Sequence, residues 1–361
     1  MLPEMRFANT AIGLSPPCLR SIQISPRSRS AAVTIPFEDS ADGGTLSGAH
    51  GPGAEQRAVV MAFRIDPTRP VGDEIARVAR DEIGRGIAAA TSRRLPLKER
   101  IHEARSCCKK VRAIFKLARS SDPHWYRREN RRLGHAARLL SAIRDNQVIL
   151  STLGTLRRAS KGTLSDSQYR RLSEALRAER EIKIVPAALT RTINTFTRQL
   201  SVTAGNLDRW QTSDAVDQLW TDFRHCYARC RRALRAVKHE HHAAAFHAWR
   251  KSAKTHYYQC RATREAWSPG TRPIIKELER LGEDLGHEHD LSVLRRRLQK
   301  LFQDKPGAQD RASLSSGLRA LAVRRKRLRA KILARGKRVF AEKPKAHAAR
   351  FRRWWKLAAT E

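Results

Sequence analysis

One pattern of side chains occurs twice in this chain of 361 residues, at a constant spacing of 145 positions. Each copy begins with His-x-x-Arg-x3-Lys and ends, some forty residues later, with Asp-x-x-Val and a leucine. The paired positions are His102 and His247, Arg105 and Arg250, Lys109 and Lys254, Asp145 and Asp290, Val148 and Val293, and Leu153 and Leu298. A register kept over more than fifty residues indicates an internal duplication, so one unit of structure is expected to occur twice.

Helical geometry turns the start of each copy into a stripe of cations. At about 100° per residue, the first set falls within an arc of roughly 80° on one side of a helix. It comprises His102, Arg105, Lys109, Arg112 and Lys116, and the second copy supplies His247, Arg250, Lys251, Lys254 and Arg261. An apolar stripe runs beside each, with Ile101, Ala104, Cys108, Val111 and Phe115 in the first copy and Phe246, Trp249, Ala253, Tyr257 and Cys260 in the second. Each helix is therefore predicted to have one buried side and one cationic side.

The chain from Val71 onward reads as one amphipathic helix after another. Helices are expected near 71–93, 97–120, 124–143, 146–159, 165–183, 187–207, 214–239, 242–266, 272–286, 290–303 and 310–335. Proline and glycine signals, such as Asp122-Pro123 and Ser268-Pro269-Gly270, separate several of them. No stretch alternates as a strand does, so the predicted class is all-α, with two pseudo-symmetric antiparallel helical bundles. The first half covers about 61–210 and the second about 211–361.

The charge of the chain is strongly one-sided. The formal net charge is +38, and residues 1–60, with as many acidic as basic side chains, contribute none of it. The excess in 61–361 predicts a domain that repels itself and is stabilised by a polyanion. A merely solvated basic surface is the alternative, although ordinary soluble domains mix the two signs more evenly.

Residues 1–60 are rich in Ser, Pro, Gly and Ala and lack sustained periodicity, so we expect a disordered extension. One hypothesis is that translation starts at Met61 and the upstream stretch is not part of the native protein. A second is a transit peptide, because the stretch from Arg6 to Ser30 is rich in Arg and Ser and poor in acids. Any native peptide upstream of Met61, detected by mass spectrometry, contradicts the first hypothesis.

The six cysteines contain no C-x-x-C pair, and no signal peptide precedes them. Reduced thiols in the cytoplasm are the simplest interpretation. No run of residues reaches the eighteen or so apolar positions that a membrane span requires, so a soluble cytoplasmic protein is expected. The sequence predicts no cofactor.

The repeated pattern resembles the CHAD domain, the conserved histidine α-helical domain. The residues that carry the resemblance are "IHEARSCCKKVRAIFKL" with "RLLSAIRDNQVILSTL", and "FHAWRKSAKTHYYQCR" with "LGEDLGHEHDLSVLRRRL". The segment "FRIDPTRPVGDEIARVARDEI" at Phe63 is similar to the usual start of such domains.

The resemblance spans roughly Met61 to the C-terminus. It implies a helical, two-fold pseudo-symmetric domain that binds inorganic polyphosphate, associates with polyphosphate granules and catalyses no reaction. One departure is Tyr257, which stands where the first copy has Arg112 and shortens the second stripe.

A polyphosphate chain offers closely spaced negative charges and no bases, so its recognition requires Arg and Lys side chains at intervals along a surface. Arg105 and Arg250 suit forked hydrogen bonds to phosphate oxygens, whereas the lysines act as point charges. Further candidates are Arg128, Arg131 and Arg138 on the third predicted helix and Arg295, Arg296 and Arg297 in the second copy.

The repeated histidines and aspartates each allow more than one role. His102 and His247 either donate hydrogen bonds to phosphate, which we favour, or bridge helices, and a metal is the third choice because neighbouring cations repel it. Asp145 and Asp290 are expected at helix starts, where an aspartate acts as an N-cap. The alternative is that each orients a cation of the stripe.

Other motifs are weaker. Glu179-x-Glu181-x-Lys183 matches the E-x-E-x-K strand of triphosphate tunnel enzymes, but its surroundings are helical. The histidines at 287 and 289 and at 239, 241 and 242 complete no metal site with Cys or carboxylate neighbours, so none is predicted. The second functional hypothesis is DNA or RNA binding through the same charge together with Trp125, Trp210 and Trp249. A polyphosphate hydrolase or kinase is the third, and no phosphate-binding Gly-rich loop or acidic metal cluster supports it.

Overall fold

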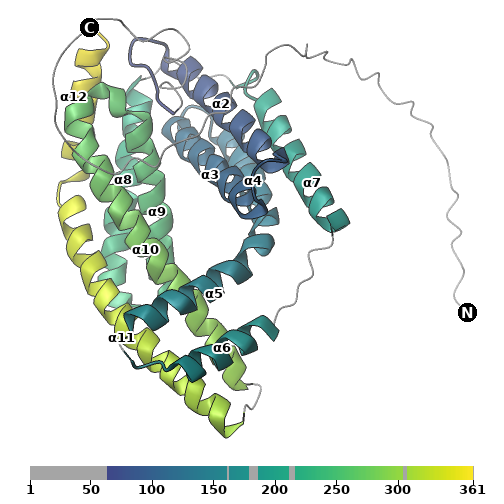
Figure 1. The fold of residues 1–361 in the computed structure, drawn as a ribbon. Coiled ribbons are helices and arrows are strands. Elements are labelled where there is room, and N and C mark those ends of the chain that lie inside the picture. The colour runs from purple at the N-terminus through teal and green to yellow at the C-terminus, as the bar shows by residue number, and fades with distance from the viewer. Residues whose placement is uncertain (1–62, 161, 179–185, 211–215, 304–306, 361) are drawn as a thin grey trace, which may run out of the picture. The chain divides into compact units, whose positions relative to one another are not determined.

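The computed structural model describes residues 63–160, 162–178, 186–210, 216–303 and 307–360, with the backbone alone at 142–147 and 302–303. Every regular element of these residues is helical, which confirms the predicted all-α class (Figure 1). The helices are α2 (Val71–Thr91), α3 (Leu97–Phe115), α4 (Pro123–Leu139), α5 (Ser141–Ala159), α6 (Asp166–Ala178), α7 (Pro186–Gly205), α8 (Val216–Glu240), α9 (Ala243–Ala262), α10 (Ser268–Gln303), α11 (Ala308–Val339) and α12 (Pro344–Ala358). Short 3-10 turns at Lys116–Ala118 and Arg264–Ala266 follow α3 and α9.

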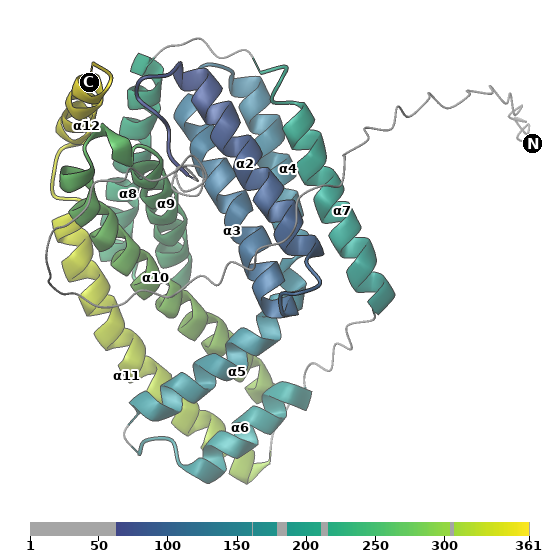
Figure 2. The ribbon, with the colours of Figure 1, turned by 45° about the horizontal axis from the view of Figure 1, so that its top comes forward.

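Two helical hairpins, α2 with α3 and α8 with α9, form the centre of the fold, and α3 packs against α9 (Figure 2). Helix α8 begins at Val216, 145 residues after α2 begins at Val71, so the register of the repeated pattern extends to these helices. All ten side chains of the two predicted apolar stripes are buried. The stripe prediction is therefore confirmed on its apolar side, and burial of this face turns the cationic face of each helix outward.

Helices α5 and α6 leave the first hairpin and pack on α10 and α11 (Figure 1). Helix α10 runs unbroken from Ser268 to Gln303, so the prediction of two separate helices at 272–286 and 290–303 is wrong. The first copy does break here, because α4 ends at Leu139 and α5 begins at Ser141. Two glycines in α10, Gly282 and Gly286, do not end the helix. They lie beneath side chains of α9 instead.

The C-terminal residues form α12, which packs on α8. The Trp355 side chain is buried against Trp220, with ring centroids 5.7 Å apart. The basic, tryptophan-containing tail therefore packs on the helical bundle. No helix in the described part of the chain combines the length and apolar character that crossing a membrane requires.

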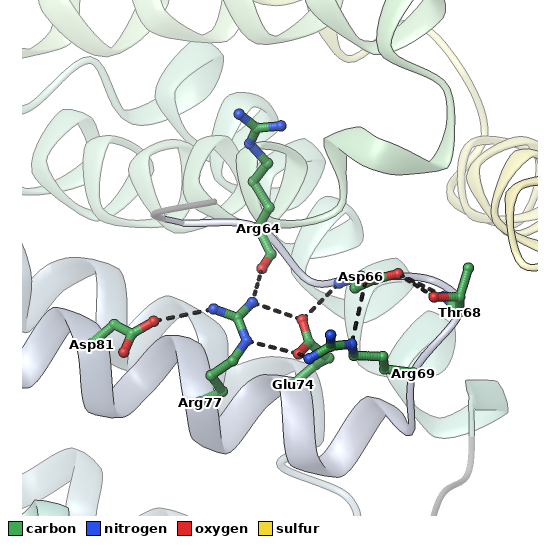
Figure 3. A network of polar contacts seen from close by, with 7 residues as sticks. All are labelled: Arg64, Asp66, Thr68, Arg69, Glu74, Arg77 and Asp81. Carbon is green, nitrogen blue, oxygen red and sulfur yellow. Dashed lines mark hydrogen bonds and ion pairs between the residues drawn. The ribbon is translucent and has the colours of Figure 1, made fainter. Parts of the chain in front are cut away.

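The segment before α2 is held by a buried carboxylate (Figure 3). Glu74 in α2 is 2% exposed and accepts hydrogen bonds from the Arg77 guanidinium and from the backbone N–H of Asp66. Arg77 also donates to the carbonyl oxygen of Arg64 at 2.8 Å. A buried charge needs such partners, and these partners fix the extended chain that carries Phe63 into the core.

Candidate polyanion-binding surface

The cations of both stripes lie at the protein surface but differ in exposure. His102 and Lys251 are exposed. The half-buried members are Arg105, Lys109 and Arg112 on α3, Lys116 at the start of the 3-10 turn that follows it, and His247, Arg250, Lys254 and Arg261 on α9. Half-buried cations have their aliphatic stems packed on neighbouring helices, which limits where each charged group can move.

Arg105 is anchored to the junction between α4 and α5. Its Nη1 donates to the carbonyl oxygen of Ala137 at 2.7 Å and to the hydroxyl of Ser141. Ala137 lies in the last turn of α4, where carbonyl groups lack partners within the helix and a cation is favourable. The guanidinium of Arg105 is thus both a structural contact and a fixed positive charge beside the stripe.

Arg112 and Lys116 continue this surface along α3. The Nε of Arg112 donates to the side-chain oxygen of Asn130 at 2.8 Å, and its guanidinium lies over Gly134 of α4. Burial lowers the pKa of Lys116, and the neighbouring charges of Arg229 and Arg112 act in the same direction. These cations repel one another, so an anion bound beside them would relieve unfavourable energy.

A second group of repelling charges surrounds His247 of α9. Its ring stacks on that of His289 in α10, with centroids 4.6 Å apart. Burial lowers the pKa of His289, and together with the neighbouring charges of Arg250, His247, Arg296 and Lys251 it brings this pKa to about 4. Burial also lowers the pKa of His247, assisted by Lys251, Arg250 and Arg296. Both rings are therefore neutral near pH 7, and the expectation that His247 belongs to the charged stripe applies only once an anion has raised its pKa.

The second stripe is interrupted where the first is continuous. In the second copy, 145 positions further along the chain, Tyr257 corresponds to Arg112 and Glu279 corresponds to Gly134. The hydroxyl of Tyr257 donates to Oε1 of Glu279 at 2.6 Å. In place of Arg112 lying over Gly134, the second copy thus has the phenol of Tyr257 hydrogen-bonded to the carboxylate of Glu279. Burial lowers the pKa of Lys254, and the charge of Glu279 acts in the opposite direction.

Aromatic rings support the last cations of the second stripe. The Nζ of Lys254 lies 4.4 Å from the ring centroid of Tyr257 and 5.1 Å from that of Tyr258. The guanidinium carbon of Arg261 lies 5.7 Å from the centroid of Tyr257 and 5.9 Å from that of Phe63. Such cation–π contacts orient the charged groups and leave them in contact with solvent.

The three arginines expected on α4 do not all face the stripe. Arg128 pairs with the buried Glu129 at 3.0 Å, and Glu129 also accepts hydrogen bonds from Thr203 and Asn206, which places this side of α4 against α7. Arg131 and Arg138 are exposed. The charge of Arg138 acts on Arg112, so the structure brings Arg138 to the first stripe.

The three consecutive arginines of α10 differ in exposure. Arg295 and Arg296 are exposed, and Arg297 is half-buried. Arg296 is near enough to lower the pKa of both His247 and His289, so it extends the second group of cations. A charge on α10 beside α9 was expected from the sequence, but the stacked His289 was not.

His102 lies in a different setting from its repeat partner. It lines a pocket of about 590 Å³ together with Val148 of α5 and with His287 and Asp290 of α10. Glu99 and Glu103 line the same pocket, so its charge is mixed rather than uniformly basic. The two repeated histidines therefore do not occupy equivalent surroundings, although their sequence positions are equivalent.

The N-cap roles predicted for the repeated aspartates are wrong. Asp290 lies in the middle of α10, and α5 begins at Ser141, four residues before Asp145. A cap must stand at the first turn, where backbone N–H groups lack partners within the helix. The structure describes no side chain for Asp145. For Asp290 the role of orienting neighbouring groups remains.

The structure describes one of two further motifs. Glu179, Glu181 and Lys183 lie outside the described residues. The histidines at 239, 241 and 242 lie where α8 ends and α9 begins: His239 is in the last turn of α8, and His241 and His242 form the connection. Nδ1 of His242 accepts a hydrogen bond from the N–H of Ala245 at 3.1 Å. His242 is therefore the N-cap of α9.

The geometry described above is that of two equivalent helices with cationic faces, and a comparison with known families agrees with it. The model of the CHAD domain matches residues 85–299, which is more than half of the chain. The chain belongs to the CHAD domain family. The matched range runs from α2 to the last turns of α10 and so contains both stripes of this CHAD domain protein.

A solved structure supports the same fold. The crystal structure of the CHAD domain from the plant Ricinus communis is 23% identical in sequence, with a TM-score of 0.51. The match covers 76% of this chain and 94% of the plant chain. At this identity the similarity supports the fold alone. No curated protein is significantly similar in sequence.

Proposed function

We propose that this CHAD domain protein binds inorganic polyphosphate through the cationic faces of α3 and α9, without catalysing a reaction. The observation that carries the proposal is the mutual repulsion of cations held in place by their neighbours, as at Arg112 and Lys116. A linear polyanion would neutralise these charges in succession and release its counterions. The proposed setting is the cytoplasm, at polyphosphate granules.

The binding residues we propose come from two regions of the fold. They are Arg105, Lys109, Arg112, Lys116, Arg131 and Arg138 around α3, and His247, Arg250, Lys251, Lys254, Arg261 and Arg296 around α9. His102 stays in the proposal through its exposed position at the N-terminal end of the first stripe. Arg128 is left out because its charge is paired with Glu129.

Nucleic-acid binding is the alternative, and burial of the tryptophans weakens it. Trp125, Trp210 and Trp249 are 4%, 8% and 0% exposed. Trp125 and Trp210 stack on each other in the core, with centroids 4.4 Å apart. Rings held there cannot stack on bases, so the aromatic part of the argument for single-stranded DNA or RNA is lost.

A competition titration tests the proposal. Long-chain polyphosphate, duplex DNA and single-stranded RNA, matched in phosphate concentration, compete for the full chain at near-physiological salt. We expect polyphosphate to win by more than about tenfold, and equal competition would favour a general polyanion binder. Orthophosphate released from polyphosphate in the presence of Mg²⁺ or Mn²⁺ would contradict the non-catalytic part of the proposal.

Two glycines allow a test that leaves the net charge unchanged. Arg112 lies over Gly134, and Arg250 lies over Gly286. We expect Gly134→Leu with Gly286→Leu to displace both guanidinium groups and to weaken polyphosphate binding by about tenfold, the value of one or two charged contacts. Gly84→Leu is the matched control, because Gly84 is an exposed helical glycine with open space around it. Equal affinity of the double variant and the control would mean that only net charge matters.

Binding is also expected to take up protons. His289, with a pKa of about 4, is neutral in the unbound protein near pH 6, and the pKa of His247 is lowered by burial and by Lys251; a bound polyanion raises the pKa of both rings. The affinity for polyphosphate should therefore rise as the pH falls from neutrality towards the pKa values of these two rings in the unbound protein. Calorimetry at pH 6 in two buffers of different ionisation enthalpy measures the uptake. His247→Gln with His289→Gln should reduce it, whereas His239→Gln, an exposed control on α8, should not.

A further inference from the structure

A buried group of sulfur and nitrogen side chains lies apart from the cationic surfaces. Cys226 belongs to α8, His256 and Cys260 to α9, and His347 to α12. These four side chains are 7%, 0%, 0% and 3% exposed, respectively. Cys230, one turn after Cys226, is fully buried beside them, and none of these cysteines forms a disulfide. Three helices thus direct soft metal-ligating atoms at one point in the core.

The distances between these atoms match the edges of a tetrahedral site. The two Nε2 atoms of His256 and His347 are 3.2 Å apart, and the Sγ of Cys260 is 3.5 Å from Nε2 of His256. The ligand atoms of His256, Cys260 and His347 all lie within 4.8 Å of one another. Around a tetrahedral Zn²⁺, bond lengths of about 2.1 Å to nitrogen and about 2.3 Å to sulfur place two nitrogens about 3.4 Å apart and nitrogen and sulfur about 3.6 Å apart.

The outer contacts of His347 are those of a metal ligand. Its Nδ1 lies 3.3 Å from Oε2 of Glu342, which also accepts a hydrogen bond from Arg350 at 2.7 Å. A carboxylate at the far nitrogen orients the ring and makes the near nitrogen the lone-pair donor.

Cys226 is the fourth ligand that the contacts favour. The side chain of His256 forms hydrogen bonds with the thiols of Cys226 and Cys260. Cys230 contacts the thiol of Cys226 instead. Cys226 rather than Cys230 therefore lies next to the imidazole of His256 and completes a set of two sulfurs and two nitrogens.

We propose that Cys226, His256, Cys260 and His347 form a structural Zn²⁺ site that clamps α12 to the α8–α9 hairpin. Two thiolates and two neutral imidazoles are a ligand set that zinc takes in closed structural sites. Burial of all four side chains leaves no open position for a substrate, so the role is stability rather than catalysis. The site does not depend on the proposed polyphosphate binding, because neither surface contributes a ligand.

Metal analysis of the full chain, expressed without a histidine tag, tests the site. We expect about one zinc per chain in the wild-type protein, and less than about 0.1 in Cys260→Ser and in His347→Gln. Cys107→Ser is the matched control, since Cys107 is a buried cysteine on α3 outside the group. A strong chelator should lower the midpoint of thermal unfolding of the wild type and of Cys107→Ser, and leave the other two variants unchanged.

Cobalt substitution keeps the proposal testable should either variant fail to fold. Wild-type protein stripped of metal and loaded with Co²⁺ should show thiolate-to-cobalt charge-transfer bands and the intense visible bands of a tetrahedral ion. Wild-type protein that binds neither Zn²⁺ nor Co²⁺ overturns the proposal, because the group would then be a hydrogen-bond network only. Equal zinc content in wild type, Cys260→Ser and His347→Gln overturns it as well, since the metal would lie elsewhere.

Discussion

Lys109→Glu combined with Lys251→Glu is expected to lower the affinity for polyphosphate about 100-fold. Each reversal removes a favourable contact and adds a repulsive one, and the two effects together cost about 1.5 kcal/mol per reversal. Lys109 belongs to the stripe on α3, and Lys251 to the stripe on α9. Lys251 is exposed, and Lys109 is half-buried. The measurement is a titration with long-chain polyphosphate over a salt series, where each lost phosphate contact should also reduce the slope of log K against log salt by about 1.

A control of equal charge separates a shaped site from net charge. Arg170 on α6 and Arg327 on α11 are exposed arginines outside both stripes. Their reversal changes the net charge by the same amount and should alter the affinity by no more than about threefold, as screened surface charges do. Circular dichroism and thermal unfolding of all variants confirm that the fold is kept. Losses of similar size in both double variants would contradict the assignment of the site to α3 and α9.

Much of the fold follows from local periodicity. The apolar stripes of α3 and α9 were predicted side chain by side chain, because helical spacing leaves one face for the core and all ten residues lie in it. The start of α4 could also be predicted from the sequence, because Asp122 is the N-cap and Pro123 the first residue of that helix. Such signals lie within a few residues of the element they specify.

Features that depend on a neighbouring helix were missed. The sequence near Gly286 does not show that the helix continues there beneath Arg250 of α9, and α10 was predicted as two helices with Asp290 as a cap. The stacking of His247 on His289 joins two helices in the same way. The grouping of Cys260 with His347 joins residues 87 positions apart, and no spacing within one helix indicates it.

Glu288→Ala should destabilise the protein by about 3–5 kcal/mol, because it leaves two cations without their buried partner. Glu288 in α10 is 1% exposed and accepts hydrogen bonds from Arg325 and Arg329 of α11, both at 2.7 Å. An arginine in the sequence of an amphipathic helix is usually predicted to lie at the surface, yet Arg325 is 6% exposed. Equilibrium unfolding in urea measures the loss, provided that the unfolding is two-state.

A control and a second variant separate the buried charge from the lost contact. Asp208→Ala removes the exposed pair with Arg80 and should cost less than about 1 kcal/mol. Combining Glu288→Met with Arg325→Met should recover most of the stability, because two apolar side chains of similar size replace a desolvated pair. A double variant as unstable as Glu288→Ala would instead mean that the ion pair itself holds α11 on α10. The charges of α11 would then contribute directly to the fold rather than merely tolerate burial.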